Sequence, residues 1–178
     1  MRFKSLALLF SLLALSCTAI ADNKTIYGLN ENVQILDLDV TLAAKLDTGA
    51  STASLSAKDI KRFKRDGETW VGFTLAVDNQ PERYIERPLA RISKIKRRAA
   101  DYEQDDGKSY TARPVINLDL CMGQQLRTIE VNLTDRSAFQ YPLLIGSDAL
   151  TDFNALVDPS LKYAAKKPSC PNDATLGE

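Results

Sequence analysis

One short segment of the sequence places a carboxylate among small and hydroxyl residues. Asp47 is followed by Thr48, Gly49 and Ala50, and it comes directly after an apolar stretch that begins at Val33. Glycine lets a chain turn sharply, and the Thr48 hydroxyl can donate a hydrogen bond to neighbouring backbone. Such a loop would hold Asp47 at the end of a strand, with its carboxylate directed into a cleft.

A carboxylate in this position can hydrolyse peptide bonds when a second carboxylate lies beside it. Two carboxylates about 3 Å apart cannot both ionise, so one of them keeps a proton. The ionised one takes a proton from water, while the protonated one polarises the scissile carbonyl. The chain contains a single Asp-Thr-Gly. The second aspartate must therefore come from another copy, which predicts a homodimer with the site on its two-fold axis.

A second segment has the form of a short buried strand that ends at a glycine. It runs from Leu143 to Gly146, and the residues from Ser147 to about Phe153 are predicted to form a short helix. An ordinary core strand that ends in a glycine turn has the same pattern. The segment by itself therefore does not indicate catalysis, but its order after Asp47 makes the pair of segments more specific than either.

The rest of the chain is predicted to be mostly β. Alternating apolar residues indicate a strand from Trp70 to Val77, and two more from Val115 to Leu120 and from Thr128 to Leu133. Helix is scarce, although Ser56 followed by Asp59 resembles a capping box and predicts a short helix that ends near Phe63. We expect a closed β fold with one or two short helices.

A charged segment separates these predicted strands. Residues 91–108 contain a run of Lys and Arg followed by a run of Asp and Glu, and the two runs can pair across a hairpin. Two interpretations stay open: a solvated charged loop, or a flap that closes over a cleft.

Composition excludes several classes of function. Lys and Arg number 23 against 23 Asp and Glu, and histidine is absent. Balanced charge gives no overall attraction to nucleic acid or to an anionic membrane. Without histidine, the chain lacks the usual general base at neutral pH and the commonest zinc ligand. It also has no glycine-rich phosphate loop, so we expect neither a metal nor a cofactor.

The first 21 residues are predicted to be a secretory signal peptide. A basic head precedes an apolar run from Leu6 to Leu15, and small residues at Ala19 and Ala21 suit signal peptidase. The run is shorter than the roughly 20 apolar residues that a spanning helix needs. Export to the periplasm is the expectation. The alternatives are a buried N-terminal helix and a lipoprotein signal, in which lipidation of Cys17 would attach the protein to a membrane.

Removal of the signal peptide leaves one domain at residues 22–163 and a polar C-terminal tail at residues 164–178. The two remaining cysteines are Cys121 and Cys170. In an oxidising compartment, such a pair suggests one disulfide that ties the tail to the domain. Two free thiols are the alternative.

Taken together, these segments resemble the bacterial retropepsin-like peptidases, some of which carry the label of ATP-dependent zinc proteases. The sequence of this chain supports neither zinc nor ATP. The matching segments are Ala44 to Ala57, Asp59 to Gly72, Arg113 to Ile116, Leu120 to Gly123, Glu130 to Arg136, Leu143 to Leu150 and Val157 to Pro159.

The resemblance implies a closed β barrel of retropepsin type and a homodimeric aspartic peptidase acting on peptides or proteins. Asp47 would be catalytic, Thr48 would brace the two loops across the dimer, and Gly49 and Ala50 would shape the loop and the approach of the substrate. The strand that supports the loop from beneath would be formed by Leu144, Ile145 and Gly146.

Two further points follow from the resemblance. Ser147 stands where the family has a basic residue, which weakens an arginine-based brace of the dimer. Asn132, Asp135 and Arg136 match the family pattern and are given structural roles.

Two other hypotheses remain beside the peptidase. The first is a periplasmic module that grips peptides in the same cleft without cutting them, and the second is a β-rich structural lipoprotein. The intact Asp-Thr-Gly favours the enzyme, because a binding protein has no need of the acid.

Overall fold

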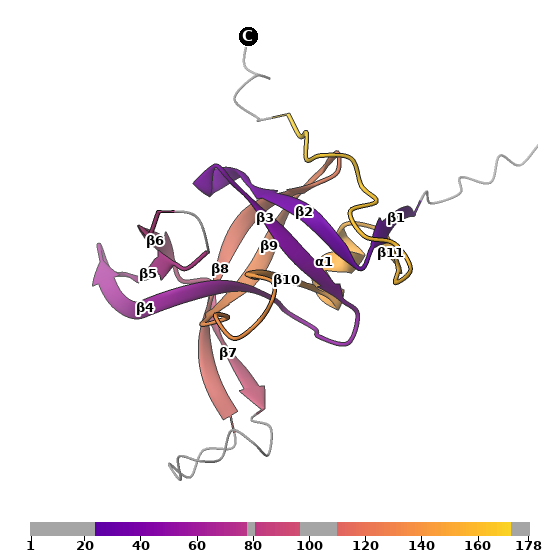
Figure 1. Ribbon diagram of the computed structural model, residues 1–178. Helices are drawn as coiled ribbons and strands as arrows, with labels where there is room; N and C mark the ends of the chain where they lie inside the picture. Colours follow the sequence, from indigo (N-terminus) through magenta and orange to yellow (C-terminus); the bar gives the residue numbers. More distant parts are fainter. Residues whose placement is uncertain (1–23, 78–80, 97–109, 172–178) are drawn as a thin grey trace, which may run out of the picture.

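The computed structural model describes residues 24–77, 81–96 and 110–171 (Figure 1). The predicted signal peptide, Cys17 and residues 97–108 of the charged segment lie outside the described residues. Within the described part of the chain, no helix is long and apolar enough to cross a membrane.

Strands dominate the described residues. They are β1 (Thr25–Gly28), β2 (Asn30–Ile35), β3 (Val40–Asp47), β4 (Ala53–Arg65), β5 (Glu68–Leu75), β6 (Arg83–Pro88), β7 (Arg91–Lys96), β8 (Tyr110–Met122), β9 (Gln125–Thr134), β10 (Leu143–Gly146) and β11 (Ala155–Asp158). A 3-10 turn, η1 (Leu36–Leu38), joins β2 to β3, and the helix α1 (Ser147–Asp152) follows β10. The predicted mostly β fold and the predicted helix after Gly146 are confirmed.

Six of the strands pair in a closed ring. The order is β10, β3, β2, β8, β9 and β4, and β4 pairs with β10 again. The pairings β3–β10 and β4–β9 are parallel, and the other four are antiparallel. The outer half of β4 leaves the ring and continues into β5 and β6, whereas β7 pairs with β8. β1 and β11 form a separate parallel pair.

The core lies inside this ring, and period-two alternation directs the side chains toward it. In β3, the buried residues are Val40, Leu42, Ala44 and Leu46. Successive side chains in a strand point to opposite faces, so Asp47 at the end of β3 points away from the core. Burial of each large aliphatic side chain stabilises the fold by about 1.5–3 kcal/mol. The apolar half of β3 thereby fixes the direction of the carboxylate.

The helix predicted from Ser56 to Phe63 is wrong, because this segment is the middle of β4. Ser56 pairs with Thr134 of β9, and most of the segment from Ala57 to Phe63 pairs with β5. These pairings with other strands override a local capping pattern. The polar residues mark an irregularity instead. Asp59 has a positive φ of 51°, and the register with β5 shifts between Lys58 and Lys61.

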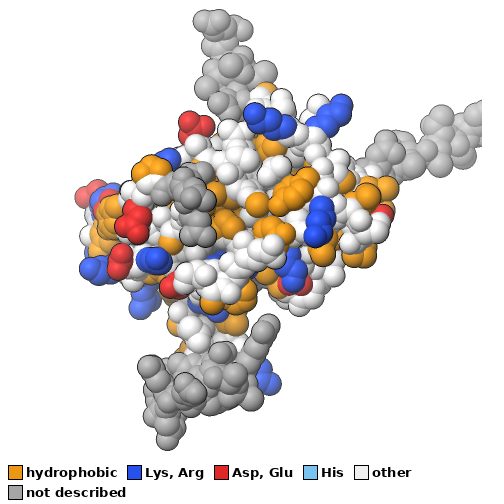
Figure 2. Space-filling model, in the orientation of Figure 1, with side chains coloured by type: hydrophobic (Ala, Val, Ile, Leu, Met, Phe, Trp, Pro, Cys, Tyr) orange, Lys and Arg blue, Asp and Glu red, His pale blue; other side chains and the backbone are white. Residues whose placement is uncertain are grey.

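The charged segment is described in part. The basic run at Arg91–Lys96 is strand β7, and it pairs with the start of β8, with Lys96 opposite Tyr110. The acidic run lies outside the described residues. Figure 2 shows Lys and Arg interspersed with Asp and Glu on the visible face of the molecule.

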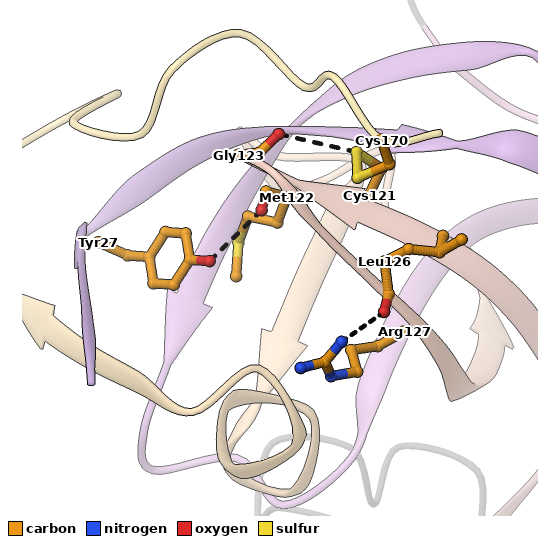
Figure 3. Close-up of a disulfide and its surroundings, with 7 residues drawn as sticks. All are labelled: Tyr27, Cys121, Met122, Gly123, Leu126, Arg127 and Cys170. Atoms are coloured by element: carbon orange, nitrogen blue, oxygen red, sulfur yellow. Dashed lines mark hydrogen bonds between the residues drawn. A yellow bond between two sulfur atoms is a disulfide. The ribbon is translucent and has the colours of Figure 1, made fainter. Parts of the chain in front are cut away.

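The described part of the C-terminal tail, residues 164–171, folds back onto the domain. A disulfide joins Cys121 near the end of β8 to Cys170 in the tail, with 5.9 Å between their Cα atoms (Figure 3). The Ser169 amide also donates to the Gly123 carbonyl at 2.9 Å. Of the two alternatives for these cysteines, the structure contains the disulfide.

We expect the Cys170→Ser variant to lose about 2–4 kcal/mol of unfolding free energy, because opening this crosslink frees a loop of 49 residues in the unfolded chain. Denaturant melts of the oxidised wild type and the variant measure the loss. Adding a reductant should lower the unfolding free energy of the wild type to that of the variant and leave the unfolding free energy of the variant unchanged. Equal stability of oxidised wild type and variant would show that the crosslink contributes nothing.

Candidate active site

The loop that carries Asp47 is built around strand β10. Leu143 pairs with Ala44 of β3 on one side and with Leu55 of β4 on the other. β10 therefore lies between the two strands that the loop connects, as Figure 1 shows. At the end of this pairing, Gly146 lies opposite Asp47. The strand predicted to support the loop is thus in direct contact with it.

Gly146 packs directly against the backbone of the loop. A Cβ atom at this position would lie 2.5 Å from the Ser51 carbonyl oxygen and 2.8 Å from that of Ala50. Two amides at the start of α1 hold the same carbonyls: Ser147 donates to Ala50 at 2.7 Å, and Asp148 donates to Ser51 at 3.1 Å. The loop is therefore fixed from beneath by backbone contacts that need glycine at residue 146.

The Asp47 carboxylate has a partner at each oxygen. The Gly49 amide donates to Oδ1 at 3.0 Å, and the Lys45 ammonium lies 3.4 Å from Oδ2. The Asp47 side chain keeps 29% of its surface exposed. Thr48 and Gly49 are exposed, and Ala50 is partly exposed. The loop thus presents an oriented, accessible carboxylate at the surface of a single chain.

Lys45 is a site residue that the sequence analysis did not single out. It lies two residues before Asp47 in the same strand, so both side chains leave the same face of β3. That spacing was the available signal. Its ammonium balances the charge of the ionised carboxylate, and it also lines a cavity next to the loop.

This cavity has a volume of about 340 Å³. Three of its lining residues are cations, Lys45, Arg136 and Lys162, and none of its described lining residues carries a carboxylate. The other lining residues are Leu29, Asn30, Phe139, Gln140 and Tyr141. A cavity with this lining favours a negatively charged group, and through Lys45 it adjoins Asp47.

Arg136 joins the cavity to the strands behind it. The side chain is 7% exposed, and it donates to the Ser54 hydroxyl at 2.8 Å and to the Tyr141 carbonyl at 3.1 Å. Burial, followed by the nearby charge of Arg113, lowers the pKa of Arg136, while Asp47 acts in the opposite direction. These contacts give Arg136 the structural role predicted for it, and they add a place in the cavity wall.

Asn132 is held in the same region. Its side-chain amide donates to the Ala53 carbonyl at 2.8 Å, which ties β9 to the start of β4 just after the Asp47 loop. Asp135 lies outside this group and caps a turn by accepting from the Ser137 amide. Within the described residues, no group of three or more Cys, Asp or Glu side chains could hold a metal ion.

A closed ring of strands, in which a short strand supports an Asp-Thr-Gly loop, is the arrangement of a retropepsin-like protein. The chain belongs to the RimB-like family, described as retropepsin-like aspartic endopeptidase RimB, whose model matches residues 26–168. The resemblance inferred from the sequence and the retropepsin-like fold are therefore confirmed.

Known relatives differ in length from this chain. A crystal structure of a Legionella pneumophila protein of unknown function is 36% identical, with a TM-score of 0.67, and the match covers 81% of this chain and 100% of that one. Proteins named probable alpha-L-glutamate ligase from Shewanella pealeana and Desulfotalea psychrophila are 33% and 32% identical over 80% and 79% of this chain. The matches cover only 30% and 29% of those relatives.

Proposed function

We propose that this protein is an exported aspartic peptidase whose catalytic site forms when two copies bring their Asp47 loops together. The observation that carries the proposal is the Asp47 carboxylate itself, oriented by Gly49 and exposed on a loop that β10 supports. One chain supplies one such carboxylate, and the chemistry requires two. The retropepsin-like family to which the chain belongs supports the same conclusion.

In the proposed dimer, the two carboxylates share one proton. The ionised carboxylate takes a proton from the attacking water, and the protonated one donates a hydrogen bond to the scissile carbonyl. The Gly49 amide fixes one oxygen of each carboxylate, and the other oxygen lies beside the Lys45 ammonium, which water or substrate would have to share or displace. Thr48 and Gly49 are exposed in the single chain, so the partner's loop can reach them.

We further propose that the substrate carries acidic side chains close to the scissile bond. The cavity beside Asp47 is lined by Lys45, Arg136 and Lys162, and charge-assisted hydrogen bonds to a carboxylate are among the stronger polar contacts. The names of the two matched ligases refer to glutamate, which suits a protein that handles glutamate-containing peptides.

Hydrolysis of matched peptides tests this function. The purified chain is incubated with peptides that differ only by Glu or Gln at each position, with and without a chelator. The proposal expects cleavage that is indifferent to the chelator and faster for the Glu peptides. A folded dimer that binds these peptides without cutting any of them would instead be a peptide-binding module.

Catalysis by a shared proton predicts a bell-shaped pH dependence of kcat/KM. The rate falls at high pH because the shared proton is lost, and it falls at low pH because the second carboxylate is protonated. Initial rates measured between about pH 4 and about pH 8 would show both limbs. A rate that stays constant into alkaline pH would contradict the shared-proton mechanism.

A further inference from the structure

The C-terminal segment Leu161–Ala165 contributes Lys162 to the lining of the cavity beside Asp47. It runs along the chain at the start of β2, where the Leu29 amide donates to the Leu161 carbonyl at 2.8 Å. Two residues later, the Tyr163 amide donates to the Asn30 carbonyl at 2.6 Å. Lys162 lies between these two hydrogen bonds and lines the cavity. The segment thus brings a cation from the end of the domain to the site.

Glu31 holds this segment in place. Its side chain is buried, with 1% of the residue exposed, and its carboxylate accepts hydrogen bonds from three backbone amides. These are Gly28 at 2.6 Å, Ala164 at 2.9 Å and Ala165 at 3.1 Å. A buried carboxylate is costly unless it is hydrogen-bonded. The amides of the C-terminal segment supply much of that hydrogen bonding, so the carboxylate and the segment stabilise each other.

Gly28 shows how closely the segment packs. A Cβ atom at this position would lie 2.7 Å from the Leu161 carbonyl oxygen and 2.9 Å from the Lys162 Cα. Tyr163 follows Lys162 in the segment. Its pKa is raised mainly by burial, then by the neighbouring Tyr141 and least by Glu31. Tyr141 is itself a lining residue of the cavity. The packing against Gly28, together with the hydrogen bonds of Leu161 and Tyr163, fixes the backbone of Lys162 on both sides.

We propose that Glu31 is a positioning residue that holds Lys162 in the cavity wall, where Lys162 binds a carboxylate of the substrate. The proposal rests on the proposed function in one respect, since it takes this cavity as the substrate subsite. Glu31 contacts no substrate and acts through the C-terminal segment. Lys162 is the specificity residue, and its effect is confined to acidic ligands.

Measurements of peptide binding test this proposal independently of hydrolysis. Affinities for a labelled Glu peptide and its Gln counterpart are measured with full-length protein carrying Asp47→Asn, which keeps the cavity and removes the catalytic acid. We expect the added Lys162→Ala substitution to lower the affinity for the Glu peptide about tenfold and to leave the affinity for the Gln peptide unchanged. Lys166→Ala is the matched control, because Lys166 directly follows the C-terminal segment but lines a different cavity, next to Gly123.

The role of Glu31 is tested by a double-mutant cycle. Glu31→Ala should lower the affinity for the Glu peptide by a similar factor. It should have no further effect when Lys162 is already alanine, since Glu31 acts through Lys162. Glu31→Gln keeps one acceptor oxygen and should restore part of the affinity. Circular dichroism checks that each variant is folded, and Lys162→Ala, at an exposed position, tests the cavity even if a Glu31 variant is not.

Three results would overturn the proposal. These are additive effects of the two substitutions, equal losses for the Glu and Gln peptides, and a parent protein that does not distinguish the two peptides. Hydrolysis by the protein with Asp47 intact is measured separately. Absence of hydrolysis together with the expected binding pattern would reject the peptidase and leave the assignment of Lys162 and Glu31 standing.

Discussion

Replacement of Asp47 by asparagine should abolish peptide hydrolysis, with a fall in kcat of about a thousandfold or more. Asparagine keeps an oxygen that can accept from the Gly49 amide, so the loop has no reason to move. It can neither take a proton from water nor share one with the partner's carboxylate. The loss should therefore appear in kcat, while the stability of the fold and of the proposed dimer stays unchanged.

Asp148→Asn is the matched control for this substitution. Asp148 is an exposed carboxylate at the start of α1, and only its backbone amide contacts the Asp47 loop. Its replacement should leave hydrolysis within about twofold of wild type, as expected for a surface substitution. Progress curves on one Glu peptide, with melting and sedimentation data for each variant, give the comparison. Undiminished hydrolysis by the Asp47 variant would remove this residue from the mechanism.

Replacement of Gly146 by alanine should damage stability and activity together. The added methyl group would meet the carbonyl oxygens of Ser51 and Ala50, which belong to the backbone and cannot rotate away. Forcing extra atoms into such a contact costs about 2–4 kcal/mol and lowers Tm by about 5–15 °C in a domain of this size. Because those carbonyls shape the Asp47 loop, kcat should also fall.

Gly72→Ala provides the contrast. A methyl group there would meet the end of the Tyr84 side chain, which is 61% exposed and free to rotate. Melting curves should show a small shift for Gly72→Ala and a large one for Gly146→Ala, although both add one methyl group to a strand glycine. Similar shifts for the two variants would mean that the contact between β10 and the loop is not tight.

The sequence predicts β5, β8 and β9 well, because their apolar residues alternate, whereas the apolar stretch that begins at Val33 is divided by η1 between β2 and β3. The prediction fails from Ser56 to Phe63 for a physical reason. The polar residues there suit a helix start when only local contacts are considered, and the strand pairings that decide the outcome are with β5 along most of the segment and with β9 at Ser56. The partner residues lie outside the segment, so the local pattern within it cannot reveal them.

The residues of the site likewise divide into those that the sequence predicts and those that it does not. Asp47 and the glycine of its supporting strand are recognisable as motifs, since the geometry of the loop demands those residue types. The cation cavity is not recognisable, because Lys45, Arg136 and Lys162 come from three separate segments that only the folded chain brings together. Glu31 resembles any charged residue at the start of a strand, and its burial appears only when the C-terminal segment is placed over it.

In the proposed dimer, two chains each contribute one Asp47 to a single catalytic site, and mixing of subunits tests this sharing most directly. Wild-type chains are unfolded and refolded with a ninefold excess of Asp47→Asn chains, and hydrolysis is measured per wild-type chain. If the site is shared, only about a tenth of the wild-type chains find a wild-type partner, and activity per wild-type chain falls to about a tenth. Refolding with excess Asp148→Asn chains should cause no such loss. Unchanged activity per wild-type chain in the Asp47→Asn mixture would show that each chain acts alone and would contradict the shared site.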